Sequence, residues 1–211
     1  MNAVTSGNLI INSVLNINEV FEFEIDTKKN CHTLAKLKGY VSEDIGVSSN
    51  LQKLEGSSIS VMGIDEDGNE MRPPVFCGLI NNVLIWQEGN GYIAEIDAVS
   101  PTELLDREEK CRSFQNIDMT YKELVRRVLA DTANTEVIFH IEDRKIGAPV
   151  YQYKETDWEF LKRIAGQLGT SLLPGGVSIK PELYFGLPRG ESREGKEARK
   201  EKTWFDQSYD T

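Results

Sequence analysis

The sequence predicts a mainly β protein with two short helices, an α+β fold in which a small β-barrel is followed by a second, incomplete barrel-like α+β domain. Apolar and polar residues alternate through much of the first hundred residues, two later segments repeat apolar residues at helical spacing, and both segments begin with the motif T-x-x-E. We expect an N-terminal barrel over residues 9–100 and a helix-strand-helix-strand portion of the second domain over 101–188. A charged loop and the start of a further, truncated segment are expected over 189–211.

Alternation identifies the first strands of the N-terminal domain. Apolar and acidic side chains alternate over residues 21–26, and Ala35 and Leu37 stand beside lysines, so each segment has one buried and one solvated face. Residues 59–61 alternate again and lead into the stretch 65–70, whose Asp-Gly pair is a strong hairpin signal.

Two longer strands are expected over residues 75–85 and 92–99, joined by a turn at 88–91. Short strands separated by turns at intervals of about ten residues are typical of a small barrel or sandwich. Pro101 ends this β region, and the pattern of the chain then changes.

Two amphipathic helices are expected at residues 120–131 and 156–168. Each begins with a capping box, in which the Thr hydroxyl accepts a hydrogen bond from the N–H of the Glu three residues on, and the Glu side chain accepts one from the Thr N–H. Met119 precedes the first helix as part of a hydrophobic staple, and Gly169 follows the second as a left-handed cap. The expected buried positions are Tyr121, Leu124, Val125, Val128 and Leu129 in the first helix and Trp158, Leu161, Ile164, Ala165 and Leu168 in the second.

Short strands are expected over residues 137–141, 171–173 and 183–185. Beyond Pro188 the chain contains a run of charged residues that cannot bury enough apolar surface to offset its ordering entropy, so a solvated loop is expected. The aromatic residues that end the chain indicate the start of a further strand: they are Trp204, Phe205 and Tyr209.

Composition restricts the function classes. Hydrophobic residues make up 39% of the 211 residues and charged residues 27%, as in ordinary globular proteins. The net charge of −10 disfavours nucleic-acid binding, because a phosphate backbone attracts clustered Lys and Arg. No apolar run reaches the ~20 residues that span a bilayer, and the N-terminus does not have the pattern of a signal peptide. We therefore expect no nucleic acid and no membrane insertion.

Residues that could support metal or nucleophilic chemistry are few. His32 and His140 are the only histidines, whereas a zinc site needs three or four converging ligands. The same scarcity argues against Ser-His-Asp and Cys-His catalysis. Cys31, Cys77 and Cys111 are an odd, widely spaced set, expected to be reduced thiols. Both histidines are expected to have structural or surface roles.

A calcium loop is the next candidate, because Asp65, Asp67, Gly68 and Asn69 resemble the start of an EF-hand loop. Position 12 of such a loop is a Glu, but here it is Phe76, and the flanking segments have the pattern of strands. A hairpin turn is therefore the favoured interpretation.

Glu155 and Glu159 are the best candidates for the paired carboxylates of a glycosidase. Glu159 is already accounted for by its capping box, and acids in a first helical turn are favoured by the helix dipole. Residues 186–190 do not have the spacing of a phosphate loop. Packing in the core is the expected role of the aromatic residues Trp86, Trp158 and Tyr184. The sequence therefore predicts no catalytic, cofactor-binding or metal-ligating residue.

Several short motifs follow one another in a definite order. Residues 76–80 read Phe-Cys-Gly-Leu-Ile, Ser100-Pro101 precede Leu-Leu-Asp at 104–106, Ser-Phe-Gln at 113–115 leads into the first helix, and residues 155–161 read Glu-Thr-Asp-Trp-Glu-Phe-Leu. Their order and spacing, over roughly residues 76–188, resemble the hub of contractile injection machines. That family includes phage late control protein D, baseplate hub proteins and the VgrG spike proteins of type VI secretion.

The resemblance implies a structural hub with two related β-barrels per subunit. Three subunits would form a ring of six barrels that adapts a sixfold tail tube to a threefold spike. The implied partners are further copies of the chain in a homotrimer, the tail tube protein, and the spike or other baseplate proteins. The resemblance also implies synthesis in the bacterial cytoplasm without a signal peptide and assembly into a phage tail or injection apparatus.

The chain also departs from the family pattern. The segment after Pro188 is too short for the oligonucleotide/oligosaccharide-binding-like barrel and the β-spike that continue a VgrG hub, so we expect a truncated chain or one half of a split hub. No catalytic residues are carried over, because the hub fold is not catalytic. Two other function classes stay open: a cell-wall glycan hydrolase associated with a phage tail, and an unrelated soluble binding domain.

Overall fold

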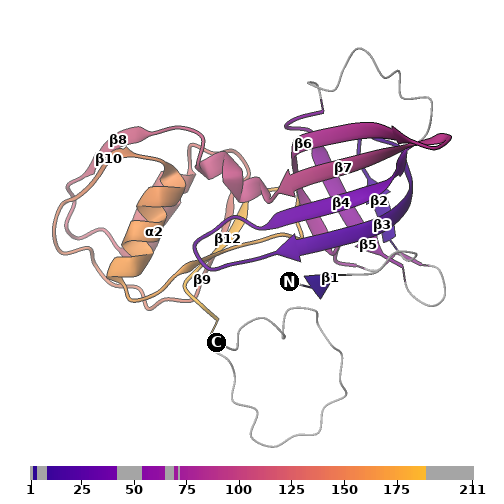
Figure 1. The fold of residues 1–211 in the computed structure, drawn as a ribbon. Helices are drawn as coiled ribbons and strands as arrows, with labels where there is room; N and C mark the ends of the chain where they lie inside the picture. Colours follow the sequence, from indigo (N-terminus) through magenta and orange to yellow (C-terminus); the bar gives the residue numbers. More distant parts are fainter. Residues whose placement is uncertain (1, 4–8, 42–53, 65–68, 71, 189–211) are drawn as a thin grey trace, which may run out of the picture.

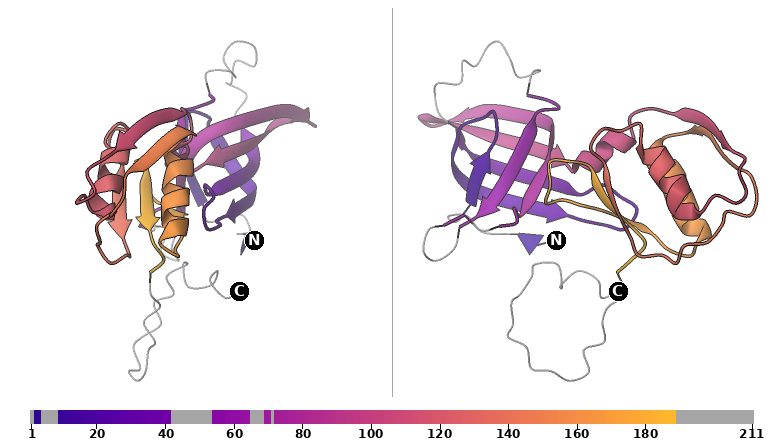
Figure 2. Two further views of the ribbon diagram at one scale, coloured as in Figure 1. Left: turned by 90° about the vertical axis from the view of Figure 1, so that its left-hand side faces the viewer. Right: turned by 180° about the vertical axis from the view of Figure 1, so that it is seen from behind.

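The computed structural model describes residues 2–3, 9–41, 54–64, 69–70 and 72–188, which form two packed units with separate hydrophobic cores (Figure 1). The first unit is a curled antiparallel β-sheet, and the second contains both helices and two small sheets. The two units lie side by side and are connected by a short 3-10 helix, η2 (Pro101–Leu105) (Figure 2). The predicted class, mainly β with two short helices, is confirmed.

A seven-stranded antiparallel sheet forms the first unit, in the order β1-β3-β4-β7-β6-β5-β2. Its strands are β1 (Asn2–Ala3), β2 (Leu9–Asn12), β3 (Ile17–Asp26), β4 (Leu34–Val41), β5 (Ser58–Gly63), β6 (Phe76–Glu88) and β7 (Gly91–Val99). The sheet curls so that β2 and β5 lie behind β4 and β7 in Figure 1. Within the described residues no hydrogen bonds join the edge strands β1 and β2, so the barrel is open along that seam.

The apolar residues that alternation assigned to the buried face of the first unit lie in or against its core, with one exception. Phe23 in β3 and Leu37 in β4 are almost fully buried, but Phe21 is 38% exposed. The pairing register of β3 against β4 shifts between Val20 and Glu22, which marks a bulge at Phe21. A bulge places an extra residue in one strand and turns its side chain away from the expected face. Val20 therefore enters the core in place of Phe21.

The second unit encloses its core between helices and short sheets. Its elements are β8 (Lys110–Phe114), α1 (Tyr121–Leu129), β9 (Glu136–Phe139), β10 (Val150–Glu155), α2 (Asp157–Gln167), β11 (Leu172–Pro174) and β12 (Glu182–Phe185). β8 and β10 form an antiparallel ribbon, and β12 pairs with β11 on one side and, in parallel, with β9 on the other. α2 packs against α1, β10 and β11.

Both helices begin where the sequence predicts, and α1 ends at Leu129, two residues before the predicted position. The Thr120 hydroxyl accepts from Glu123 N at 3.2 Å while Glu123 Oε2 accepts from Thr120 N at 2.9 Å, and the corresponding distances at Thr156 and Glu159 are 3.1 and 3.0 Å. Gly169 ends α2 with a φ of 68°, in the left-handed region that favours glycine. Most of the predicted helical stripe is buried, as is Phe160, which the stripe did not include.

Two strands of the second unit, β8 and β10, were not predicted, so the observed order contains a strand before each helix. The predicted turn at 65–70 lies largely outside the described residues, as does the segment 189–211 with Trp204, Phe205 and Tyr209.

Two glycines provide a matched test of packing. A Cβ on Gly39 of β4 would lie 2.5 Å from the carbonyl oxygen of Glu19, whereas a Cβ on Gly166 of α2 would have no neighbour within 4 Å. We expect Gly39→Ala to destabilise the protein by about 1–3 kcal/mol because backbone must move. Gly166→Ala should stabilise it by roughly 0.5–1 kcal/mol, since alanine restricts the unfolded chain and favours the helix. Urea unfolding of both variants checks the prediction, and changes of the same sign would contradict it.

Candidate functional site

The most distinctive site of the molecule is the joint between the two units. The loop between β3 and β4, residues 27–33, extends from the first unit onto the second, near β12 in Figure 1. Asn30 N donates to the Leu172 carbonyl at 2.8 Å, and Leu172 N donates to Asn30 Oδ1 at 2.9 Å. Asn30 has a φ of 62°, which asparagine tolerates better than most residues. A third bond, from Cys77 N to the Gly176 carbonyl at 2.6 Å, joins the first sheet to the same region.

His32 extends the joint into the core of the second unit. Its ring packs against that of Trp158 of α2 with a centroid distance of 4.5 Å and a tilt of 37° between the ring planes. Nδ1 lies 2.9 Å from Thr102 Oγ1, and Nε2 lies 3.2 Å from Asp106 Oδ2. A carboxylate only accepts, so Nε2 carries the proton and Nδ1 accepts from the Thr102 hydroxyl. The other oxygen of Asp106 accepts from the Thr156 hydroxyl, so the imidazole is connected to the N-terminal cap of α2.

The hydroxyl groups behind His32 form a directional chain. Thr102 uses its hydroxyl proton to donate to His32, so Thr102 Oγ1 accepts from the Ser100 hydroxyl at 2.8 Å. Ser100 Oγ in turn accepts from Thr33 N at 3.1 Å. The hydrogen bonds connect a hydroxyl, an imidazole and a carboxylate in the sequence found in catalytic triads: Thr102, His32 and Asp106. Thr102 is 0% exposed, however, so its hydroxyl cannot meet a substrate. The arrangement connects three elements and offers no reaction centre.

Burial lowers the pKa of His32 below its usual value, and the hydrogen bond with Asp106 opposes this only in part. The unfolded chain therefore takes up the proton at a higher pH than the folded chain, and stability falls as the pH drops below about 6.5. We expect wild type to lose stability between pH 7.5 and 5 more steeply than His32→Gln, which lacks this protonation. Urea midpoints of both proteins across that range test the prediction, and parallel curves would contradict it.

A second polar cluster lies inside the second unit, at the N-terminal end of α2. Asp157 is 1% exposed, and its carboxylate forms ion pairs with Lys110 and Arg112 of β8, both at 2.8 Å. Gln152 of β10 donates to it at 3.0 Å. Asp131, just beyond α1, pairs with the same two cations and its pKa is lowered, chiefly by the charge of Arg112. The cluster therefore connects the β8–β10 ribbon to both helices.

The remaining candidates for metal and thiol chemistry lie apart from one another. His140 stacks on Tyr184 with a centroid distance of 5.9 Å, and Cys31, Cys77 and Cys111 are free. In the part of the chain that the structure describes, no group of three His, Cys, Asp or Glu side chains could hold a metal ion. Asp65, Asp67 and Gly68 of the calcium-like motif lie outside that part.

The carboxylate pair considered for glycoside hydrolysis is engaged in structural contacts. Arg163 holds Glu155 with two bonds of 2.7 Å and lowers its pKa, while Glu159 completes the cap of α2. A general acid of a glycosidase needs a raised pKa, which is the opposite shift.

Among the aromatics, Trp158 is buried as expected, but the expectation for Trp86 was wrong, because it is 39% exposed. Trp86 lies on the outer face of β6, while Val83 and Ile85 face the core.

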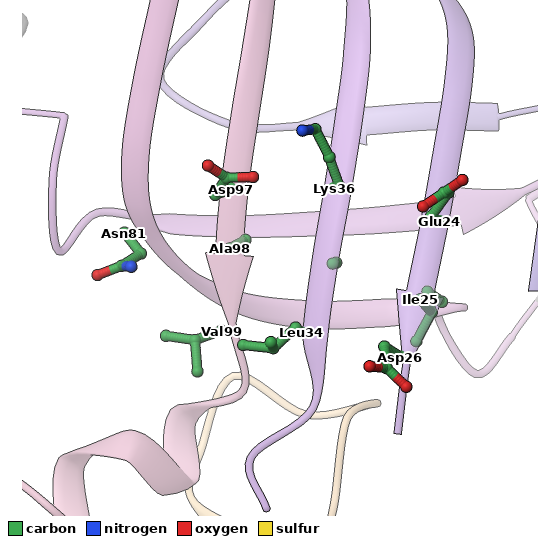
Figure 3. A pocket seen from close by; sticks show the side chains of 10 residues that line it. Glu24, Ile25, Asp26, Leu34, Lys36, Asn81, Asp97, Ala98 and Val99 are labelled. Carbon is green, nitrogen blue, oxygen red and sulfur yellow. The ribbon is translucent and has the colours of Figure 1, made fainter. Parts of the chain in front are cut away.

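One hollow of about 340 Å³ lies on the outer face of β3, β4 and β7 (Figure 3). Its charged groups include Asp26, Lys36 and Asp97. Asp26 pairs with Lys28 at 2.6 Å, Lys36 pairs with Glu95 at 2.6 Å, and Asp97 accepts from Asn82 at 3.4 Å. These groups are engaged with neighbours on the rim instead of converging on a common point in the hollow.

The fold is that of tail proteins from phages and related secretion systems. A type VI secretion component of E. coli, itself described as structurally similar to tail proteins of bacteriophage T4, matches with a TM-score of 0.61 at 15% identity, covering 84% of this chain and 49% of its own. A 43 kDa prophage tail protein of Shewanella oneidensis matches with a TM-score of 0.60 at 14% identity, covering 83% and 52%. A tail protein of Neisseria meningitidis gives 0.55 at 14% identity, covering 84% and 50%. The chain thus spans about half the length of these structures.

The sequence model of the phage tail baseplate hub family, GPD, matches residues 16–172. The chain belongs to this family of structural tail hub proteins, and the resemblance inferred from its motifs is confirmed. No curated protein matches the sequence significantly. Within the described ranges no helix is long and apolar enough to cross a membrane.

Proposed function

We propose that the chain supplies two units of a structural hub that adapts a sixfold tail tube to a threefold spike in a contractile phage tail or related injection apparatus. The observation that carries this proposal is the family match over residues 16–172, which runs through both units and the joint. An adapter must hold its parts in one orientation, and the bonds of Asn30 and His32 across the joint meet that requirement.

The proposed role is mechanical and not enzymatic. The Thr102 hydroxyl beside His32 is buried away from substrate, and Glu155 is kept ionised by Arg163. These contacts support a scaffold whose polar groups serve its own rigidity. The proposed partners are further copies of the chain in a homotrimer, the tail tube protein, and the spike or other baseplate proteins, assembled after synthesis in the bacterial cytoplasm.

Light scattering tests the proposal with this chain alone and with a polypeptide that supplies the rest of the hub. We expect weak association for the chain alone, seen only at high concentration, and a threefold particle once the rest is present, because permanent interfaces of this kind bury on the order of 2,000 Å² or more. A stable dimer in both samples would contradict the proposal. Hydrolysis of cell-wall glycan that disappears in Glu155→Gln but persists in the exposed control Glu142→Gln would favour the enzyme instead.

A further inference from the structure

A group of exposed apolar side chains lies at one end of the first sheet, and we call it the outer aromatic patch. It consists of Phe21 of β3, Tyr40 of β4, and Leu84 and Trp86 of β6, which are 38–54% exposed, around Ile93 of β7. Scattered apolar residues are normal on a protein surface, whereas a contiguous group often marks an interaction site.

Strand register shows that the patch is contiguous. Tyr40 of β4 lies opposite Ile93 of β7, and Ile93 lies opposite Trp86 of β6, so the three side chains form one row across the sheet. Ile93 alternates with Ala94 and Ile96 of the core and therefore points outward, yet it is only 4% exposed. Cross-strand neighbours lie about 5 Å apart, close enough for the two flanking rings to cover it.

The bulge in β3 adds the fourth member of this surface. It turns Phe21 out of the core and places its ring 5.6 Å from that of Tyr40. Bulges are often found where a side chain is re-aimed for a function. The β3 bulge therefore enlarges the outer aromatic patch at the expense of the core.

The rim of the patch is acidic. Glu19 lies opposite Tyr40 in the next strand, and Glu88 follows Trp86 by two residues on the same face. Neither forms an ion pair within the described residues. The nearby Lys38 is neutralised by two carboxylates at 3.0 and 3.3 Å. A partner for this surface should combine apolar or aromatic contact with positive charge.

The second unit carries a surface of that kind, which we call the basic face of α1. It is formed by Lys122, Arg126 and Arg127, and for the described chain no ion pair is found for any of the three. Lys122 and Arg126 instead lie 5.7 and 5.0 Å from the centre of the Phe139 ring. Guanidinium groups also stack well on Trp and Tyr rings, which the patch provides.

The two surfaces lie on opposite sides of the molecule. In Figure 1 the layer of β3, β4, β7 and β6 faces the viewer, whereas α1 comes to the front only when the molecule is seen from behind in the right panel of Figure 2. A surface on one side that fits a different surface on the other side produces head-to-tail contacts, which give a ring when the rotation from copy to copy closes and a filament when it does not.

We propose that the outer aromatic patch of one copy of this chain docks on the basic face of α1 of the next copy. This inference rests on the proposed ring-forming hub and names the surfaces that would form its subunit contact. A contact between the outer aromatic patches of two copies is disfavoured, because it would bring the acidic residues Glu19 and Glu88 of one copy close to those of the other.

Sedimentation velocity of the full 211-residue chain, up to several hundred micromolar, tests the contact. Tyr40→Arg should weaken self-association about tenfold or more, as removal of an aromatic anchor typically does. Tyr153→Arg is the matched control, because Tyr153 is 70% exposed on β10 and lies outside both surfaces. It should associate like wild type, and equal melting temperatures of the two variants would show that both are folded.

Mixing two defective variants tests the head-to-tail geometry itself. Tyr40→Arg retains the basic face, and a double variant Arg126→Gln/Arg127→Gln retains the patch without placing new acids opposite the introduced arginine, so a mixture has one intact contact and should form a 1:1 heterodimer that does not grow further. A mixture that stays monomeric, a Tyr40→Arg chain that associates like wild type, or a wild-type chain that is monomeric at every concentration would overturn the proposal. If the complete hub still formed a threefold particle with Tyr40→Arg, only this inference would fail and the proposed function would stand.

Discussion

Trp158→Ala is expected to lower the stability of the protein by about 3–5 kcal/mol, as loss of a buried aromatic side chain typically does. Trp158 is 1% exposed and contributes to two structures at once: it fills the core of the second unit, and it supports the His32 ring at 4.5 Å across the joint. The variant should therefore weaken the second unit and also release the loop between β3 and β4.

Glu159→Ala is the matched control, one residue away in the same helix. Its side chain accepts one bond, from Thr156 N at 3.0 Å, and its loss should cost roughly 1 kcal/mol. Thermal melts of both variants compare the two effects. Equal shifts of the melting temperature would show that Trp158 does not anchor α2, and Trp158→Phe should recover part of the loss.

Asp157→Ala is expected to cost about 3–5 kcal/mol as well, although it removes a single acid of a kind that is usually exposed. The carboxylate is 1% exposed and stands between Lys110 and Arg112, whose side chains are themselves mostly covered. Removing it leaves two cations without their buried partner and leaves Gln152 with the Glu155 carbonyl as its remaining acceptor. Breaking one side of a buried pair is costly for that reason.

An exposed ion pair provides the control for Asp157. Asp118 and Lys145 are joined at 2.8 Å, but their side chains are 73% and 65% exposed, so Asp118→Ala should change stability by no more than about 1 kcal/mol. Urea unfolding at neutral pH measures both variants. A similar loss in both would mean that solvent screens the Asp157 cluster despite its burial.

Local signals in the sequence were sufficient to predict the two helices but not to predict the strands β8 and β10. A capping box acts within four residues, so Thr120 and Thr156 mark helix starts whatever surrounds them. In β8 and β10 the usual pattern is reversed, because Arg112 and Gln152 face inward to bind Asp157 while Tyr151 and Tyr153 face solvent. A strand with polar residues inside and aromatic residues outside does not match the alternation rule.

The contacts at the joint could not be predicted from the sequence, for a different reason. Its residues are short polar ones in a turn, and nothing near Asn30 or His32 in the chain indicates that their partners are Leu172 and Trp158. Trp86 illustrates the same limit: its residue type predicted burial, but its position in β6, out of phase with Val83 and Ile85, determined exposure. Pairing across distant strands sets such outcomes, and single-chain patterns do not record it.

The loop between β3 and β4 also bears on how the chain unfolds. Asn30 bonds to a residue 142 positions later, so the first sheet and the end of the second unit share contacts that are among the most distant in the chain. Contacts of this kind close a very long loop and form late, because its entropy must be lost before they are gained. Once formed, they tie the free energies of the two units together. Denaturation should therefore follow one cooperative transition, and Asn30→Gly should lower its midpoint without dividing it, because the backbone bond of residue 30 and the packing of His32 on Trp158 remain.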